Sequence, residues 1–423
     1  MGISQQVEDA MQRCYEGSLH DDMLNSFRIK AWDRFLQTGF CLKNMSPFIK
    51  KFEKLFDKDL DLVTYSNEEK ENISSYILPE SSNSHIVFVN GHLDKSLSNI
   101  SAFEDADLYS LTEAMDFFGI YLQGRFLEGI DKEKDPFAIL NTAIYSKGAF
   151  FYLPAFQKSK SPLQVIHIID KSKAYYSPRL QIVLSDGASL DFINTYIVKE
   201  KVSKEEFFYN YLMDLSLDTK SKATLYNHHQ NSSEGFIFES LRADLKGEAD
   251  LKSVSVIQGK NIYQNYSVDL LETKSRVSLQ GLSFLKDTEL CKTDICITHA
   301  AEDCFSDQLF KAALTGESRN YFSGKIFVKP VAQQTVAYQM SQNLLLSEKA
   351  FCQSKPNLEI LADDVKASHG MTATELNPDQ LFYLTSRGLN PGEAKNLIVE
   401  GFCKKIIDQC KVPFLKEKML HGL

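Results

Sequence analysis

The sequence predicts a mainly β protein with helical segments at both ends of the chain. Between about residues 84 and 352, apolar and polar residues alternate in short runs, a pattern typical of strands. Gly, Asn, Asp and Ser separate these runs, as they do at turns. Apolar residues recur at helical spacing near the start of the chain and again near its end.

Residues 1–80 are predicted to form an N-terminal helical region. Two sets of apolar residues at helical spacing predict it, and charged residues supply a solvated face beside the second set. The first set is Phe27, Ala31, Phe35 and Leu36, and the second is Phe48, Phe52 and Leu55. We therefore expect amphipathic helices before the strands begin.

Residues 81–352 are predicted to be the β-rich core, with its last strands reaching about residue 375. The clearest predicted strands are residues 85–89, 165–169, 180–184, 190–198, 236–238, 251–257 and 277–284. Two segments of this region, 107–128 and 203–213, have helical spacing instead. Many short strands fit a sandwich, a barrel or a β-solenoid, and no strict repeat separates these three. In a solenoid each coil buries its inner face by stacking on the next coil.

Residues 376–423 are predicted to form a C-terminal helical domain. Asn377-Pro378 and Asn390-Pro391 each place an N-cap Asn before a Pro at the first helical position, and Gly388 occupies a C′ position. The second helix carries the apolar stripe Ala394, Leu397, Ile398, Gly401, Phe402 and Ile406. This stripe must pack against the chain's own body or a partner, and spacing alone favours the first.

Composition and charge exclude several classes of protein. The 47 Lys and Arg against 56 Asp and Glu give a formal net charge of 47 − 56 = −9, which argues against non-specific nucleic-acid binding. No apolar run approaches the roughly 18–20 residues of a membrane helix, and the first residues lack the apolar core of a secretion signal. No P-loop motif for ATP is present. We therefore expect a cytoplasmic protein whose eight scattered cysteines are free thiols.

The first segment that could carry chemistry lies before residue 305. It contains His299, Glu302, Asp303 and Cys304, a set of ligands that could support soft-metal or redox chemistry. The alternative, which spacing alone favours, is a loop between strands that holds a hydrogen-bonded histidine.

The second such segment combines two acids, a lysine and a histidine just before the C-terminal helices. It contains Asp363, Asp364, Lys366 and His369, followed by Gly370. A histidine beside a glycine can be approached closely, and neutral imidazole is a good ligand of iron or zinc. The alternative, which spacing alone slightly favours, is the polar end of a strand. If they lie close to His369 in the fold, Asp363, Asp364 and Lys366 could orient it or tune its protonation.

Adjacent histidines occur at His228 and His229. Neighbouring residues of a strand point to opposite faces of its sheet, so the two imidazoles would not bind one metal ion. We interpret them as a surface or turn pair.

A dense set of motifs lies between about residues 296 and 405. The motifs are Ser323–Val328, Ala337-Tyr338-Gln339, Asn343–Ser347, Lys355-Pro356, Leu358–Ile360, Ala362–Lys366, Ser368-His369-Gly370, Leu381–Leu384 and Ser386-Arg387-Gly388. Together they resemble the SufB/SufD family, and the Ala362–Gly370 run is more similar to SufD than to SufB. One departure is Ala367, which stands where many SufD chains have Cys.

This resemblance implies a fold and a role. The fold would be a right-handed parallel β-helix flanked by N-terminal and C-terminal helical domains. The role would be that of a scaffold subunit, not an enzyme, of the SUF iron–sulfur cluster assembly system. Such a subunit pairs with SufB, docks the ATPase SufC, and builds a transient cluster at the interface with SufB. The isolated chain would hold no cluster or iron tightly and could form a homodimer.

The resemblance also implies site residues. His369 carries over as the histidine that meets iron or the nascent cluster, and His299 and Cys304 are weaker candidates. The surface that docks SufC would be made by Leu381, Phe382, Tyr383, Arg387, Ala394, Leu397, Ile398 and Phe402. The alternative hypothesis is a stand-alone iron- or zinc-dependent β-helix enzyme that gathers His299, Cys304 and His369 in one site.

Overall fold

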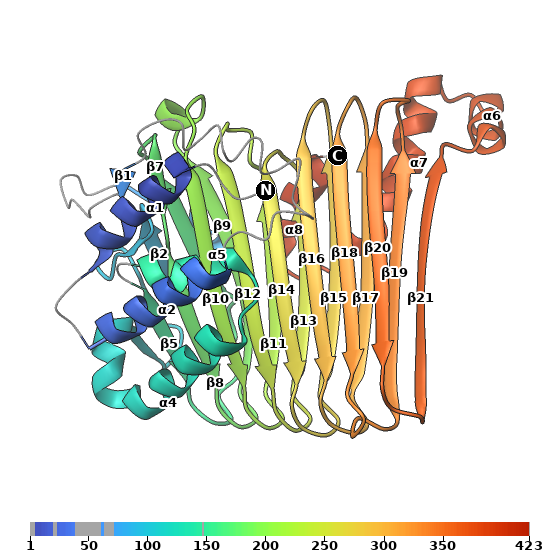
Figure 1. Cartoon of the computed structure of the whole chain (residues 1–423). Helices are drawn as coiled ribbons and strands as arrows, with labels where there is room; N and C mark the ends of the chain where they lie inside the picture. The colour runs from blue at the N-terminus through green and yellow to red at the C-terminus, as the bar shows by residue number, and fades with distance from the viewer. Residues whose placement is uncertain (1–4, 20–22, 39–60, 63–71, 146–147, 423) are drawn as a thin grey trace.

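The computed structural model describes residues 5–19, 23–38, 61–62, 72–145 and 148–422. Two sheets of mainly parallel strands face each other and form a β-solenoid (Figure 1). The predicted mainly β fold with helices at both ends is therefore confirmed. Of the three architectures that the sequence left open, the structure is the solenoid and neither the sandwich nor the barrel. No helix in these described ranges is long and apolar enough to cross a membrane.

The strands divide between two sheets, here called sheet A and sheet B. The main path of sheet A contains β4 (Asp107–Ser110), β5 (Ala149–Leu153), β8 (Arg179–Leu184), β10 (Phe208–Leu217), β12 (Phe236–Leu245), β14 (Ile262–Leu270), β16 (Leu290–His299), β18 (Arg319–Val328) and β20 (Phe351–Ile360). Beside it, β7 (Ala174–Tyr176) pairs with β10 and with β1 (Asp61–Leu62). Sheet B contains β2 (His85–Val89), β3 (His92–Leu93), β6 (Leu163–Ile169), β9 (Ser189–Val198), β11 (Lys222–His229), β13 (Asp250–Ile257), β15 (Arg276–Leu285), β17 (Phe305–Leu314), β19 (Thr335–Leu345) and β21 (Val365–Glu375).

From β8 onward the chain alternates between the sheets, and each strand pairs in parallel with the strand two positions later. Alternate residues of each strand point into the lumen between the sheets, where those of the next coil cover them. In β18 these inward residues are Asn320, Phe322, Gly324, Ile326 and Val328, and all five are buried. The lumen is therefore one continuous core along the solenoid.

One corner of the solenoid recurs with the same backbone geometry in successive coils. Lys220, Glu248, Lys274, Asp303 and Gln334 all have φ between 57° and 62°, in the left-handed region. The N–H of each donates to a carbonyl of the next coil, as Asp303 does to Gln333 at 3.0 Å. The corner repeats in geometry while its residue type changes, which explains why the sequence shows no strict repeat.

Helices α1 (Gln5–Ser18), α2 (Asn25–Thr38), α4 (Leu111–Lys132) and α5 (Pro136–Ile144) cover the outer face of the first strands of sheet A (Figure 1). Phe27, Ala31 and Phe35 of α2 are buried there, which confirms the first predicted helical set. The fourth residue of that set, Leu36, is 60% exposed instead of buried. The second set, Phe48, Phe52 and Leu55, lies outside the described residues.

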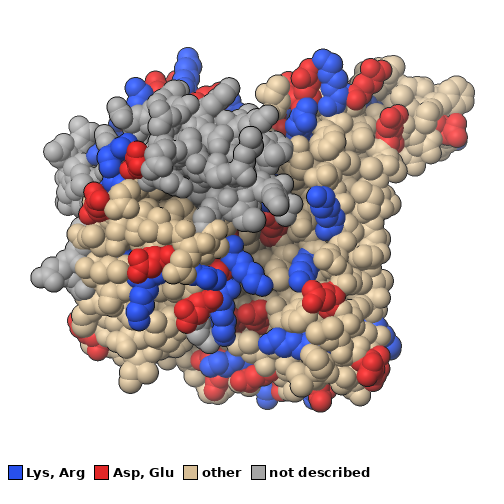
Figure 2. All heavy atoms as spheres, in the orientation of Figure 1, with Lys and Arg blue, Asp and Glu red and all other residues tan. Residues whose placement is uncertain are grey.

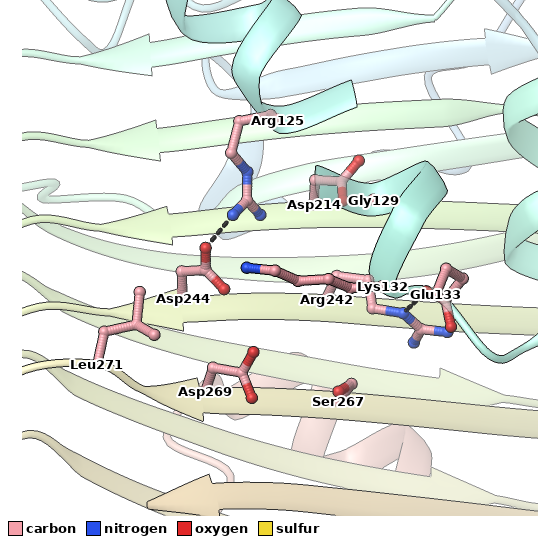
Figure 3. A pocket seen from close by; sticks show the side chains of 10 residues that line it. All are labelled: Arg125, Gly129, Lys132, Glu133, Asp214, Arg242, Asp244, Ser267, Asp269 and Leu271. Atoms are coloured by element: carbon pink, nitrogen blue, oxygen red, sulfur yellow. Dashed lines mark hydrogen bonds and ion pairs between the residues drawn. The ribbon is translucent and has the colours of Figure 1, made fainter. Parts of the chain in front are cut away.

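Charged side chains fasten α4 to sheet A. Arg125 of α4 pairs with Asp244 of β12, and Arg242 of β12 pairs with Glu133 at the end of α4 (Figure 3). These residues line a cavity of about 180 Å³ between the helix and the sheet, together with Lys132 and others. Figure 2 shows acidic and basic side chains interspersed over the face beside these helices.

The predicted helix at residues 203–213 is wrong. A short 3-10 helix, η3 (Glu200–Val202), is followed by strand β10, which is buried along its whole length. Phe137 of α5 stacks on Phe208 from outside, while Tyr209 and Tyr211 face the lumen. Both faces of β10 are covered, and its outward positions hold polar residues such as Asn210 and Asp214 as well as apolar ones such as Leu212, so the apolar residues do not alternate strictly.

The interpretation of His228 and His229 as a surface or turn pair is also wrong. Both lie in β11 and both are buried. They do point to opposite faces: His229 contacts Glu239 inside the lumen, and His228 bonds Gln258 at 2.7 Å near helix α8 (Pro413–His421). The helix covers the outer face there, so neither histidine reaches solvent.

At the C-terminal end, α7 (Pro391–Ile407) and α8 pack on the outer face of sheet B. The predicted stripe of α7 splits, because Ala394 and Ile406 are buried while Leu397 is exposed. α6 (Pro378–Ser386) stands beyond the last coil with no buried residue (Figure 1). One side of α7 therefore packs against the chain's own sheet B, and the other side is exposed to solvent.

The predicted caps of these helices are confirmed. The Asn377 side chain accepts from the N–H of Asp379, and Asn390 forms a reciprocal capping box with Glu393. Gly388 has φ 101°, and the N–H of Leu389 donates to Leu384, as in a Schellman turn.

We predict that Asn390→Ala lowers the free energy of unfolding by about 1 kcal/mol, because the cap supports a helix that buries part of the core. The matched control is Asn377→Ala. Asn377 caps α6, a helix with no buried residue, so its loss should leave the free energy of unfolding unchanged. Urea denaturation followed by circular dichroism measures both. Equal losses from the two variants would contradict this account.

Candidate functional site

The last coil leaves the solenoid open at one end. Among the described strands, β20 pairs only with β18, and β21 pairs only with β19. Neither β20 nor β21 contains a buried residue, whereas β18 alternates between buried and partly exposed residues. Pro356 in β20 fits such an edge, because proline cannot donate to a further strand. The outer edges of both strands are therefore free to pair with another chain.

His369 lies on the inward face of this last coil. It pairs in register with Gln339 of β19, whose side chain is buried in the lumen, while the neighbouring Tyr338 and Met340 face outward. Because residues in parallel register share a face, His369 also points inward, yet it is exposed since no further coil covers it. Its neighbours on the same face of β21, Ala367 and Met371, are apolar, and the residue in the coil beneath it is Gln339.

The charged residues near His369 in sequence are not near it in space. Asp363 and Asp364 lie in the turn before β21, and at about 3.3 Å per residue Asp364 is about 16 Å away along the strand. Lys366 belongs to the opposite face, because three residues separate it from His369. No described residue forms a hydrogen bond with the imidazole of His369.

The structure places His299 and Cys304 two coils before the last one. His299 ends β16 and is buried, with its Nε2 2.8 Å from the Ser306 hydroxyl oxygen, and burial lowers its pKa to about 4. Cys304 is buried at the corner before β17, with its Sγ 3.3 Å from the carbonyl oxygen of Glu272. Burial raises the pKa of this thiol, so it is protonated at neutral pH.

Cys304 occupies one position in a column of small residues at that corner. Ser275 precedes it in the coil before, and Thr335 follows it in the coil after; all three are fully buried. His299 and Cys304 therefore form part of the solenoid wall, and His369 lies apart from them at the open end. In the described parts of the chain, no three His, Cys, Asp or Glu side chains are grouped to hold a metal ion.

The C-terminal helices expose apolar side chains, on α6 beyond the last coil and on α7 over sheet B. Phe382 is 74% exposed, Tyr383 56% and Leu397 49%. The Arg387 guanidinium lies 5.1 Å from the Tyr383 ring centroid, which adds a cation to the aromatic surface. We call the accessible members of the predicted docking surface the docking patch: Leu381, Phe382, Tyr383, Arg387, Leu397, Ile398 and Phe402. Ala394 is fully buried under this surface and is left out of the patch.

Sequence analysis missed a polar cluster inside the lumen. The fully buried carboxylate of Glu239 lies 3.0 Å from His229 Nε2, and Tyr196 and Asn227 donate hydrogen bonds to it at 2.7 and 2.6 Å. Burial alone would raise the pKa of Glu239, but His229 and the hydrogen bonds from Tyr266 and Tyr196 lower it below the ordinary value. The only sequence signal was the polar residue type, since which strand positions face inward depends on the register of the coils.

The sequence of this region matches a known protein family. The family described as "SUF system FeS cluster assembly, SufBD core domain" matches residues 167–402, more than half of the chain.

The chain belongs to the SufBD family. A SufBD family iron–sulfur cluster assembly protein of Synechocystis is 27% identical over 358 residues, 82% of this chain and 78% of the relative. The iron–sulfur cluster assembly protein SufD of Escherichia coli is 33% identical over 165 residues, 39% of each chain. SufD of Bacillus subtilis is 22% identical over 386 residues, covering 88% of this chain and 83% of the relative.

The SufBD match covers the solenoid from β6 to β21 and continues through α6 into α7. It thus includes both the open end and the whole docking patch. The predicted family resemblance is confirmed, and the protein is a member of an iron–sulfur cluster assembly family.

The buried state of His299 predicts how stability depends on pH. Folding lowers its pKa from an ordinary 6.5 to about 4, so between these values the unfolded chain binds a proton more readily. The His299 contribution to stability is complete above about pH 6.5 and is lost as the pH falls toward 4. His299→Gln, which can still bond Ser306 without ionising, should make that loss shallower by up to about 1.4 kcal/mol per pH unit.

Urea unfolding between pH 7 and 4.5 measures this slope. The exposed His421→Gln is the matched control and should keep the slope of the unmodified protein. An unchanged slope in His299→Gln would show that His299 does not contribute to this loss, which the buried His228 and His167, whose pKa values are also lowered by burial, would then supply.

Proposed function

We propose that this chain is a SufD-like scaffold subunit of the SUF system, which pairs with a SufB homologue and docks the ATPase SufC. Two relatives named SufD, from Escherichia coli and Bacillus subtilis, support this assignment. The SufD-like run around His369 supports it further, as does the absence of a P-loop from this chain, which leaves ATP hydrolysis to a separate subunit.

The observation that carries the proposal is the open end of the solenoid with His369 on its inward face. The free edges of β20 and β21 offer backbone groups to the strands of a partner, which would extend the two sheets across the junction. A partner solenoid seated there would enclose His369 between the two last coils. Without SufB, two copies of this chain could pair through the same edges about a two-fold axis.

Iron and the nascent cluster are the cargo of this site. In its neutral form, one ring nitrogen of an imidazole offers a lone pair to iron, with less tenacity than a thiolate. On the same face, Ala367 has no ligand atom and the Met371 thioether is a weaker ligand than imidazole, so we expect the remaining strong ligands to come from the partner's side of the junction. A single histidine ligand on this chain suits a cluster that is assembled and then released.

The stand-alone enzyme hypothesis required His299, Cys304 and His369 to share one site. His299 and Cys304 are buried in the solenoid wall and His369 is at its open end. Nothing in this arrangement favours that hypothesis.

The docking patch is the proposed surface for SufC. Exposed apolar patches mark interaction sites, and aromatic and Arg side chains most often supply the binding energy of an interface. Here Phe382, Tyr383 and Arg387 are exposed on or just after α6, a helix without a buried residue of its own. α7 and α8 bury part of the core of sheet B, so surface substitutions test this docking better than removal of the helices.

We predict that His369→Ala lowers the yield of assembled cluster by about tenfold or more, while the complex with SufB and SufC still forms. The reason is that the substitution removes the ligand without changing a buried residue. Reconstitution of the purified complex with iron and a sulfur donor, followed by absorbance spectroscopy, measures the yield. Ser368→Ala on the opposite face of β21 is the matched control, and full yield from His369→Ala would refute the ligand role.

We predict that the double variant Phe382→Ala and Leu397→Ala weakens SufC binding at least tenfold, or about 1.4 kcal/mol, because it removes exposed anchors of the docking patch. Isothermal titration with purified SufC measures the affinity. Phe117→Ala with Ile120→Ala is the matched control, since these residues of α4 are 69% and 92% exposed at the other end of the solenoid. Equal affinities for the two double variants would place SufC elsewhere.

A further inference from the structure

A column of amide side chains leads through the lumen to His369. Gln308 of β17, Gln339 of β19 and His369 of β21 are paired residues on three consecutive strands of sheet B, all facing inward. Strands in a sheet lie about 4.8 Å apart, so side chains at paired positions can hydrogen bond along the column. Gln339 Nε2 donates to Gln308 Oε1 at 2.9 Å, which fixes one end of the Gln339 amide.

The other end of the Gln339 amide has no partner. Gln339 is 2% exposed, and its Oε1 is buried without a hydrogen bond among the described residues. The nitrogen bonds Gln308 in the preceding coil, and the paired residue in the following coil is His369. A buried acceptor without a donor is costly, so a donor that can reach this oxygen would be stabilised there.

The opposite wall of the lumen leaves room for this amide. Gly324 of β18 faces Gln339, and a Cβ at that position would come within 2.0 Å of Gln339 Nε2. A glycine is therefore needed here for the amide to lie across the lumen in its present orientation. Above Gly324, the paired residue in β20 is Pro356, which donates no backbone hydrogen bond to this space.

We propose that Gln339 is a positioning residue for His369: its Oε1 accepts the ring N–H of His369 and so directs the other ring nitrogen out of the open end. This inference rests on the proposed function, since it concerns how His369 meets its cargo. His369 is exposed and reaches the bond by rotating its own side chain. Fixing one ring nitrogen as the donor leaves the lone pair on the other nitrogen, the form that binds metal.

The test reads the ring N–H of His369 directly in the full-length chain. A solvent-exposed imidazole N–H exchanges quickly with water, whereas one bonded to a buried oxygen exchanges slowly. In protein labelled with ¹⁵N-histidine, with the signal assigned from the spectrum of His369→Ala, we expect exchange at least tenfold slower in the unmodified chain than in Gln339→Leu. Gln339→Met is a second variant of similar length without the amide, and thermal unfolding verifies that both variants fold.

Ser341→Ala is the matched control, because Ser341 lies on the same inward face of β19 and bonds Ser354 instead of Gln339, so its substitution should preserve the slow exchange. A second arm measures cluster yield in the reconstituted complex, which we expect to fall by about tenfold in Gln339→Leu and to be retained in Ser341→Ala. Equally fast exchange in the unmodified chain and in both Gln339 variants would overturn the inference. Slow, Gln339-dependent exchange with full cluster yield from His369→Ala would support the contact and overturn the proposed function instead.

Discussion

The in-register stacking of parallel coils is the constraint on which the rest of this structure depends. Because each strand pairs in register with the strand two positions later, inward residues remain inward in every coil, and each coil is covered by the next. The same rule leaves the final coil without a cover. The exposed inward face of β21, with His369 on it, is thus a direct consequence of how the core is built.

Stacking also governs which polar groups the lumen tolerates. Glu239 is held in the interior because His229, Tyr196 and Asn227 lie on strands whose register brings them around it. Farther along, one hydrogen bond joins the paired glutamines of β17 and β19 and leaves the Gln339 Oε1 without a bond among the described residues. Because an isolated buried polar group is costly, the polar side chains of this core gain stability where they form connected sets.

The helices use the two outer faces unequally. Those of the N-terminal part cover the first strands of sheet A through aromatic packing and ion pairs such as that of Arg125 with Asp244. Those of the C-terminal part cover sheet B, but α6 extends past the last coil and buries none of its residues. The open end and the exposed helix are therefore neighbours in the chain but separate surfaces, which suits the two partners proposed for this chain.

The sequence by itself determined the mainly β class, the capped helices at Asn377 and Asn390, and the family, because alternation, capping and short motifs are local patterns. It could not show that β10 is a strand, since apolar residues such as Leu212 on its covered outer face interrupt the alternation. It could not separate His369 from His299 and Cys304, because all three are ordinary polar positions until the coils are stacked. Only the tertiary structure decided which of them is exposed, since exposure here depends on whether a further coil lies above, and that is set by register between distant strands.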